Sequence, residues 1–140
     1  MFSQRVKSVM EHKKLLTAPP QTTVGDAARL MEQKQVGAVL VVDGELLVGI
    51  FTERDAVFRV IANGRDVSTT LLGEVMTPTP LSVDPEKTFG HALKLMHERG
   101  FRHVPVVSEG KPVGIVSARS ALDPDMEEFV SEEQRRRHIK

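Results

Sequence analysis

Two short segments of the chain combine a hydroxyl side chain with an arginine, a pairing that suits phosphate binding. Residues 49–55 read Gly-Ile-Phe-Thr-Glu-Arg-Asp, and residues 114–120 read Gly-Ile-Val-Ser-Ala-Arg-Ser. In each segment an apolar run ends at the hydroxyl, Thr52 or Ser117, where a helical pattern begins. The free N–H groups and the dipole of a helix start favour an anion, to which Thr52 and Arg54 could donate hydrogen bonds. Asp55 could accept from paired hydroxyls such as those of a ribose.

Helix capping explains the same residue types. Thr52 and Asp55 form a Thr-x-x-Asp capping box, and Ser117 is a favourable N-cap residue. From the spacing alone, capping is the favoured interpretation. The two interpretations are compatible, because one hydroxyl can cap a helix and also face a ligand.

No pattern of an enzyme or a metal site is found elsewhere in the sequence. His91, His97 and His103 are six residues apart, which does not place neighbours on one helix face. Gly110-Lys111 lacks the other residues of a phosphate-binding P-loop, and neither a G-x-S-x-G nor an H-E-x-x-H segment occurs. We therefore expect no catalytic residues, no catalytic cofactor and no metal site, and predict that the protein is not an enzyme.

The composition is that of an ordinary globular protein of 140 residues, with 40% apolar and 27% charged residues. Its 19 basic and 19 acidic side chains cancel, which disfavours a nucleic-acid partner. The absence of cysteine excludes disulfides and thiolate chemistry. The longest apolar run, Ala38 to Val42, is far shorter than the ~20 residues of a membrane-spanning helix, and no secretory signal is visible. We expect a cytoplasmic protein without a membrane partner.

The sequence repeats itself at an offset of 65 residues. Residues 16–56 align without a gap on residues 81–121, and roughly a third of the aligned positions are identical. Met10 matches Met76 at an offset of 66, so the first copy begins near residue 9. We predict a first repeat over residues 9–64, a linker over 65–74, a second repeat over 75–123 and a charged, helical C-terminal tail over 124–140.

Each copy predicts the same order of elements, β–α–β–β–α. Thr23 and Thr88 are N-cap candidates for helices with apolar stripes at helical spacing. The stripes are Val24, Ala27, Ala28 and Met31 in the first copy and Phe89, Ala92, Leu93 and Met96 in the second. Short β-branched runs predict strands over residues 39–42, 46–51, 104–107 and 112–116. A second helix is expected from Glu53, with Ala56, Val57, Val60 and Ile61 on one apolar face, and its counterpart near residues 118–122.

A unit of about 60 residues cannot bury these stripes by itself. We therefore expect an α+β fold in which two tandem β-α-β-β-α repeats pack around a pseudo-two-fold axis.

With this repeat, its Val-Pro-Val-Val run at residues 104–107 and its Gly-Ile-Phe-Thr-Glu-Arg-Asp segment, the chain resembles a cystathionine-β-synthase-type (CBS) domain pair, or Bateman module. The resemblance covers about residues 9–123. The family motif is Gly, apolar, any, Thr or Ser, any, any, Asp. The first copy matches it through Gly49, Ile50, Thr52 and Asp55, whereas the second has Ser120 in place of the Asp.

The resemblance implies two clefts between the repeats that bind adenosine-containing ligands such as AMP, ADP, ATP, S-adenosylmethionine, NAD or cyclic dinucleotides. It implies that Asp55 holds the ribose hydroxyls, and that Thr52 and Arg54 hold the phosphate. The other repeat then supplies the rest of this main site: Pro80, Leu81, Phe101, Arg102, His103 and Ile115. A second site uses Ser117, Arg119 and Ser120, with Leu15, Leu16, Val36 and Ile50 as its wall.

The two sites are predicted to be unequal. Ser120 cannot accept hydrogen bonds as a charged carboxylate does, and Gly37 and Ala38 stand where the main site has Arg102 and His103. We predict tighter nucleotide binding in the Asp55 site.

The resemblance further implies a regulatory, signal-transduction module that senses an adenine nucleotide and passes its occupancy to an effector protein or to its own homodimer. The alternative is an interaction or scaffold protein whose clefts are degenerate. Ser120 favours this alternative for one cleft, and Asp55 argues against it for the other.

Overall fold

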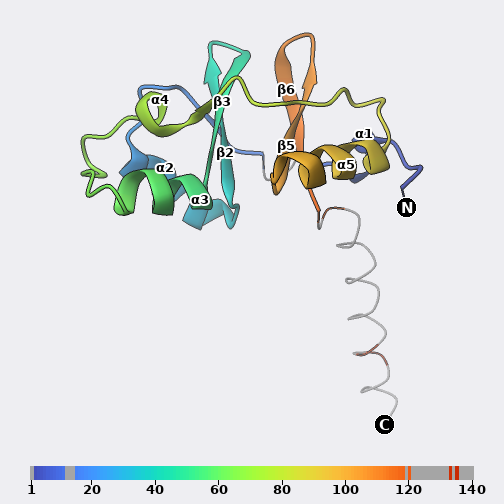
Figure 1. Cartoon of the computed structure of the whole chain (residues 1–140), viewed down its shortest axis with the longest axis horizontal. Coiled ribbons are helices and arrows are strands. Elements are labelled where there is room, and N and C mark those ends of the chain that lie inside the picture. Colours follow the sequence, from blue (N-terminus) through green and yellow to red (C-terminus); the bar gives the residue numbers. More distant parts are fainter. Residues whose placement is uncertain (1, 12–14, 119, 121–132, 134, 136–140) are drawn as a thin grey trace.

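Two antiparallel β-hairpins stand side by side at the centre of the molecule, with helices on both flanks (Figure 1). The computed structural model describes residues 2–11, 15–118, 120, 133 and 135. In the first hairpin β2 (Ala38–Asp43) pairs with β3 (Leu46–Thr52), and in the second β5 (His103–Ser108) pairs with β6 (Lys111–Ser117). Both hairpins shift register at the matching position, after Val41 and after Val106. The predicted α+β fold with two strand pairs is confirmed.

The two long helices begin where the sequence predicts. The Oγ1 of Thr23 accepts from the N–H of Asp26 (3.1 Å) to start α2 (Val24–Lys34), and Thr88 does the same for His91 (3.2 Å) at α5 (Phe89–Arg99). The carboxylate of Asp26 does not close a capping box but pairs with Arg29 at 2.9 Å. The buried stripes are those predicted, except that Ala28 is exposed and Leu93 is only partly buried.

Each hairpin pairs with a parallel segment on one side and an antiparallel segment on the other. In the first repeat β1 (Thr17–Ala18) pairs in parallel with β2, and β4 (Thr77–Pro78) pairs in antiparallel with β3. The second repeat has single bridges at the same places: Val83 is parallel to Val106, and Glu11 is antiparallel to Ile115. The sheets therefore repeat the same plan around a pseudo-two-fold axis.

The short helix that leads each repeat packs on the other repeat. Helix α1 (Val6–Val9) contributes Val6 to the second core, with Val83, Phe89 and Val104, and Figure 1 shows α1 beside α5. Helix α4 (Leu72–Val75), which begins inside the predicted linker, contributes Leu72 to the first core. Each core is thus completed by a segment from outside its own repeat.

The helix after β3 differs from its prediction. Helix α3 (Glu53–Asp55) passes into η1 (Ala56–Ile61), a π-helix. Of the predicted apolar face Val60 is fully buried and Ala56 is partly buried, whereas Val57 is 49% and Ile61 67% exposed. Hydrogen bonds from residue i+5 to residue i widen the turn, so side chains three and four positions apart no longer stack on one face. Most of the counterpart near residues 118–122 and of the C-terminal tail lies outside the described residues.

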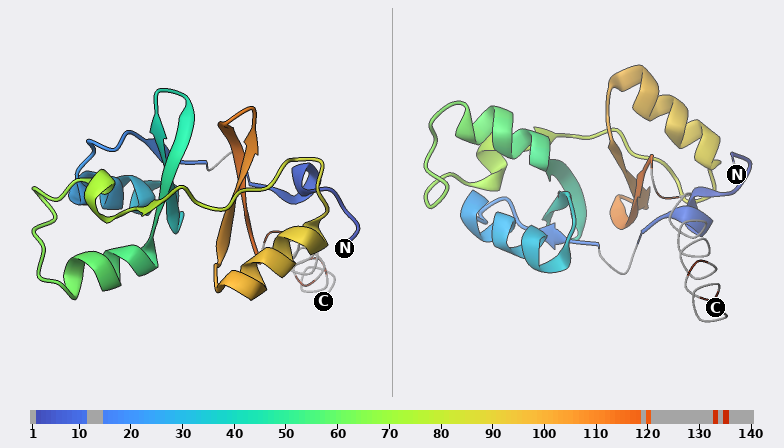
Figure 2. Two further views of the ribbon diagram at one scale, coloured as in Figure 1. Left: turned by 45° about the horizontal axis from the view of Figure 1, so that its top comes forward. Right: turned by 90° about the horizontal axis from the view of Figure 1, so that it is seen from below.

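The two hairpins meet through an apolar cluster of their own. Ala38, Leu40 and Ile50 are buried there, with Leu15, Leu47 and Ile115 partly buried around them. At the turn end of the hairpins the N–H of Leu47 donates to the carbonyl of Gly110 (3.1 Å). Figure 2 shows the hairpins adjacent from two further directions. Within the described residues, no helix has the length and apolar character needed to span a membrane.

Candidate functional site

The junction between β3 and α3 is closed by a reciprocal capping box. The backbone N–H and the hydroxyl of Thr52 both donate to Oδ2 of Asp55, at 2.9 and 3.2 Å, and the N–H of Asp55 donates to the Thr52 hydroxyl at 3.3 Å. Asp55 is only 8% exposed. The capping interpretation of these residues is therefore confirmed, and it fixes a buried carboxylate at the end of the strand.

The other oxygen of that carboxylate faces an arginine one turn further along. Oδ1 of Asp55 lies 3.4 Å from Nε of Arg59, whose Nη1 also donates to the carbonyl of Met76 at 3.0 Å. The guanidinium of Arg54 lies over the ring of Phe58, 5.0 Å from its centroid. A ribose that binds Asp55 must therefore share the carboxylate with Thr52 and Arg59.

The second junction copies this box with neutral groups. The N–H of Ser117 donates to Oγ of Ser120 at 2.8 Å, the two hydroxyls are 3.3 Å apart, and the N–H of Ser120 donates to the Ser117 carbonyl at 3.1 Å. Ser120 thus performs the capping role of Asp55 without its charge. Arg119, also predicted for this site, lies outside the described residues.

The motif glycines Gly49 and Gly114 make room for two repeat-matched methionines. A Cβ on Gly49 would overlap Sδ of Met76, and one on Gly114 would lie 2.6 Å from Sδ of Met10. Each methionine follows a leading helix that packs on the other repeat. The glycine of the motif is therefore needed where β3 or β6 packs closely against the methionine that follows α4 or α1.

Replacing Gly49 with alanine is expected to lower the free energy of unfolding by about 1–3 kcal/mol, because the added methyl must displace Met76. The loss should shrink in a Met76→Ala background, where the space is free. Urea unfolding of the four proteins in this cycle measures the difference. Equal losses in both backgrounds would contradict the contact, and Gly114→Ala with Met10→Ala provides the repeat-matched cycle.

The first junction acts electrostatically on the start of β5 in the other repeat. Burial lowers the pKa of His103, while the negative charge of Glu53 acts in the opposite direction and the positive charge of Arg102 lowers the pKa further. Glu53 begins α3, so the first junction carries a charge that acts on His103, one of the two predicted phosphate donors of the second repeat. Both arginine and histidine come from the second repeat, as the prediction requires.

The predicted wall of the main site is partly assembled at the same place. Val83 runs parallel to β5, which directs the preceding Pro80 and Leu81 toward the start of that strand. Leu81 and Phe101 are 37% and 39% exposed, so their apolar surfaces remain available. Ile115, the last member, lies instead in the cluster between the hairpins.

The wall residues predicted for the second site are divided between two environments. Leu15 and Ile50 belong to the cluster between the hairpins, where they meet Ile115. Leu16 is buried in the core of the first repeat, and Val36 packs against that core. The structure therefore brings only part of this set toward the other repeat.

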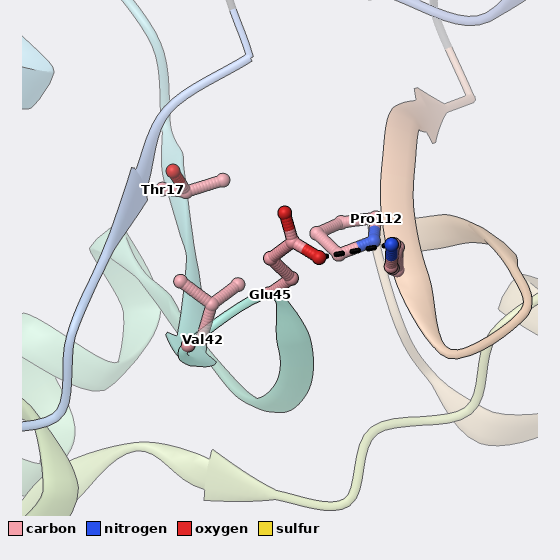
Figure 3. A pocket seen from close by; sticks show the side chains of 6 residues that line it. Thr17, Val42, Glu45 and Pro112 are labelled. Atoms are coloured by element: carbon pink, nitrogen blue, oxygen red, sulfur yellow. Dashed lines mark ion pairs between the residues drawn. The ribbon is translucent and has the colours of Figure 1, made fainter.

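A cavity of about 300 Å³ lies at the opposite end of the hairpins, between their turns (Figure 3). Its walls are Thr17, Val42, Gly44, Glu45, Lys111 and Pro112, none of which is a predicted ligand contact. An ion pair of 2.9 Å between Lys111 and Glu45 crosses it from one repeat to the other. The cavity is thus a feature of the contact between the turns and is separate from the two junctions.

Sequence reasoning missed three residues around the first junction: Glu53, Phe58 and Arg59. Arg59 could have been found, because it stands four residues after Asp55, the spacing of an ion pair along a helix. Phe58 has the same spacing from Arg54, whose guanidinium lies over its ring. Glu53 had no such signal, since its effect on His103 depends on the other repeat.

The CBS-domain family model matches residues 6–62 and 72–125. The chain belongs to the CBS-domain family. The two matched ranges are the two repeats, so the protein carries a CBS-domain pair.

Relatives in this family include proteins much longer than this chain. The sequence is 38% identical over 120 residues to the CBS domain-containing protein CBSCBSPB3 of Arabidopsis thaliana, covering 85% of this chain and 22% of that protein. It is 39% identical over 101 residues to the CBS domain-containing protein YhcV of Bacillus subtilis, covering 72% of this chain and 71% of YhcV. The chain thus spans only about a fifth of the first relative.

Solved structures of CBS-domain proteins share the whole arrangement. A CBS-domain protein of Burkholderia ambifaria, described as a candidate signal-transduction protein, superposes with a TM-score of 0.80 at 31% identity, covering 89% of this chain and 95% of that one. CBSX2, a protein of Arabidopsis thaliana solved in complex with AMP, superposes with a TM-score of 0.72 at 28% identity, covering 89% and 97%.

Proposed function

We propose that this CBS-domain pair is a regulatory module that binds an adenosine-containing ligand in the cleft between the first junction and the start of β5. The observation that carries the proposal is the buried carboxylate of Asp55, fixed by its capping box at the first junction, whose neighbour Glu53 acts electrostatically on His103 of the other repeat. A buried carboxylate stands on one side, and the guanidinium of Arg102, the imidazole of His103 and exposed apolar side chains stand on the other. That combination suits a nucleoside with a phosphate.

Each side chain has a distinct role in this proposal. Asp55 accepts hydrogen bonds from the ribose, through the oxygen that Arg59 approaches only to 3.4 Å. Thr52 and Arg54 hold the phosphate from the first repeat, with Arg102 and His103 opposite them. In the structure the guanidinium of Arg54 lies over the ring of Phe58. Pro80, Leu81, Phe101 and Ile115 form the apolar wall for the base.

The second site, around Ser117, Arg119 and Ser120, is the weaker one in this proposal. The hydroxyl of Ser120 already accepts from the Ser117 backbone, and it carries no charge. Leu16 is committed to the core of its own repeat, which leaves Leu15 and Ile50 as the wall. The binding of AMP by CBSX2 supports an adenine nucleotide as the ligand class.

We infer that ligand occupancy is passed on through a homodimer, an effector protein or both. Val57, Phe58 and Ile61 expose apolar surface along η1, directly after the junction that holds Asp55. Apolar side chains grouped on one helix favour association with a second protein surface. A change at the junction would reach that surface without crossing the rest of the fold.

Native mass spectrometry of the purified protein, with and without added AMP, tests both parts of the proposal. The expected result is a dimer that carries an adenosine-containing ligand, either retained through purification or bound on addition of AMP. Denaturing extraction identifies a retained ligand, which would stand out near 260 nm because the protein has no tryptophan or tyrosine. A protein that retains nothing and binds no AMP would favour the alternative, a scaffold with degenerate clefts whose carboxylate serves only as a cap.

A further inference from the structure

Arg59 contacts two parts of the proposed cleft at once. Its Nε lies 3.4 Å from Oδ1 of Asp55, and its Nη1 donates to the carbonyl of Met76 at 3.0 Å. A guanidinium suits this task, because its donors are arranged in a rigid plane and can serve two acceptors together. The side chain therefore ties the buried carboxylate of the first junction to the chain that crosses between the repeats.

The segment that starts at Met76 leads to Pro80 and Leu81, which are proposed to contact the base of the ligand. We name residues 76–81 the crossover segment: it starts at Met76, forms β4 and ends at Pro80 and Leu81 of the proposed wall. Its path is constrained, since Thr79 has a φ of +44° while its N–H donates to the carbonyl of Val48 at 3.0 Å. A β-branched residue such as Thr79 is strained at a positive φ, and the following Pro80 adds to this strain. The segment needs external contacts to keep this conformation.

We propose that Arg59 is a positioning residue that presets the cleft by holding Asp55 and the crossover segment in one arrangement. The inference rests on the proposed adenosine site. Without Arg59, the ligand would have to order the segment itself, and that ordering weakens binding. Fixing the backbone of a single residue corresponds to about a tenfold change in a binding constant.

The second repeat lacks this link in its sequence. The position 65 residues after Arg59 is Pro124, which has no side-chain donor, and the position matching Asp55 is Ser120. Carboxylate and arginine thus occur together in the first repeat and are both replaced in the second. This joint occurrence is what a coupled role predicts, because each residue is the ion-pair partner of the other.

Amide exchange in the ligand-free protein tests the link without assuming any ligand. Arg59→Ala and Asp55→Asn are each expected to speed the exchange of the Thr79 amide, and the double variant should exchange no faster than Arg59→Ala alone. Arg65→Ala is the matched control: Arg65 pairs with Glu74 of α4 at 2.6 Å, has similar exposure and does not touch Asp55. Additive effects of the two variants, or an equal effect of Arg65→Ala, would overturn the proposal.

Titration with AMP provides the second arm. Arg59→Ala should bind AMP about tenfold more weakly than the natural protein, whereas Arg65→Ala should bind it equally well. Unchanged affinity in Arg59→Ala would show that the cleft is not preset by this residue. If the natural protein itself binds no AMP, the adenosine site fails, and the exchange of the Thr79 amide still decides whether Arg59 couples Asp55 to the crossover segment.

Discussion

Asp55→Ala is expected to weaken AMP binding about thirty-fold in calorimetric titration. Hydrogen bonds to a charged acceptor contribute roughly 1.5–3 kcal/mol, and a loss of about 2 kcal/mol corresponds to that factor. The carboxylate is 8% exposed and held by its cap, so its position is fixed before a ribose arrives. No neighbouring side chain in the capping box could replace its charge.

The same substitution removes the Asp55 half of the capping box of α3, so stability must be measured beside affinity. We expect the free energy of unfolding to fall by about 0.5–2 kcal/mol, as for a lost cap, because the N–H of Thr52 loses its acceptor while its hydroxyl still caps the backbone N–H of residue 55. Ser120→Ala is the matched control, since it removes the corresponding acceptor of the second junction. We expect Ser120→Ala to lower stability while the AMP affinity of the main site is retained.

Two results would contradict the assignment of Asp55. Unchanged AMP affinity in Asp55→Ala would remove the ribose role and leave the capping role alone. Equal losses of affinity in Asp55→Ala and Ser120→Ala would attribute the effect to helix caps in general. Asp55→Asn separates the two roles further, because an amide oxygen can still cap the helix but carries no charge.

Much of the fold could be predicted because the same pattern occurs in both repeats. The run Val104 to Val107 and its counterpart Val39 to Val42 each hold three valines and are followed by turn residues, and they lie in β5 and β2. The register shift after Val41 and Val106 is likewise repeated. Local preference and repeat agree at these positions, so the pattern alone was sufficient.

The helix after β3 could not be predicted from its spacing. Its apolar residues fit the period of an α-helix, but the backbone bonds from Ala62 to Val57 and from Arg65 to Val60 have the i+5 spacing of a π-helix. That change turns Val57 and Ile61 outward. The search for apolar periodicity assumes the 3.6 residues per turn of an α-helix, so it cannot detect a π-helix, whose turn is wider.

The candidate site was predictable at its motif and less so at its walls. Thr52 and Asp55 follow from the strand end and the helix start, which are local features. Leu15 and Leu16 are adjacent in the sequence, yet one lies between the hairpins and the other in the first core. The packing of the other repeat decides which of two neighbouring apolar side chains lies between the hairpins. The local sequence pattern does not show this.

The packing of α1 and α4 on the repeat that each does not lead yields the prediction with the largest effect on stability. Leu72→Ala is expected to lower the free energy of unfolding by about 2–5 kcal/mol, as for other buried leucines. Its side chain is fully buried in the first core, although it opens the second repeat. In native-state amide exchange the loss should appear mainly in β2, the central strand of the first repeat.

Val6→Ala tests the same crossed packing for α1, and its effect is expected in the second repeat instead of the first. Val6 is fully buried in the second core, although it leads the first repeat, so its truncation should loosen β5 more than β2. If Leu72→Ala loosened β5 and Val6→Ala loosened β2, each helix would belong to its own repeat and the crossed packing would be wrong. The expected crossed pattern means that neither CBS repeat has a complete core alone. A displacement of the segment before one repeat would then change the core of the other, so the proposed ligand could act on both cores.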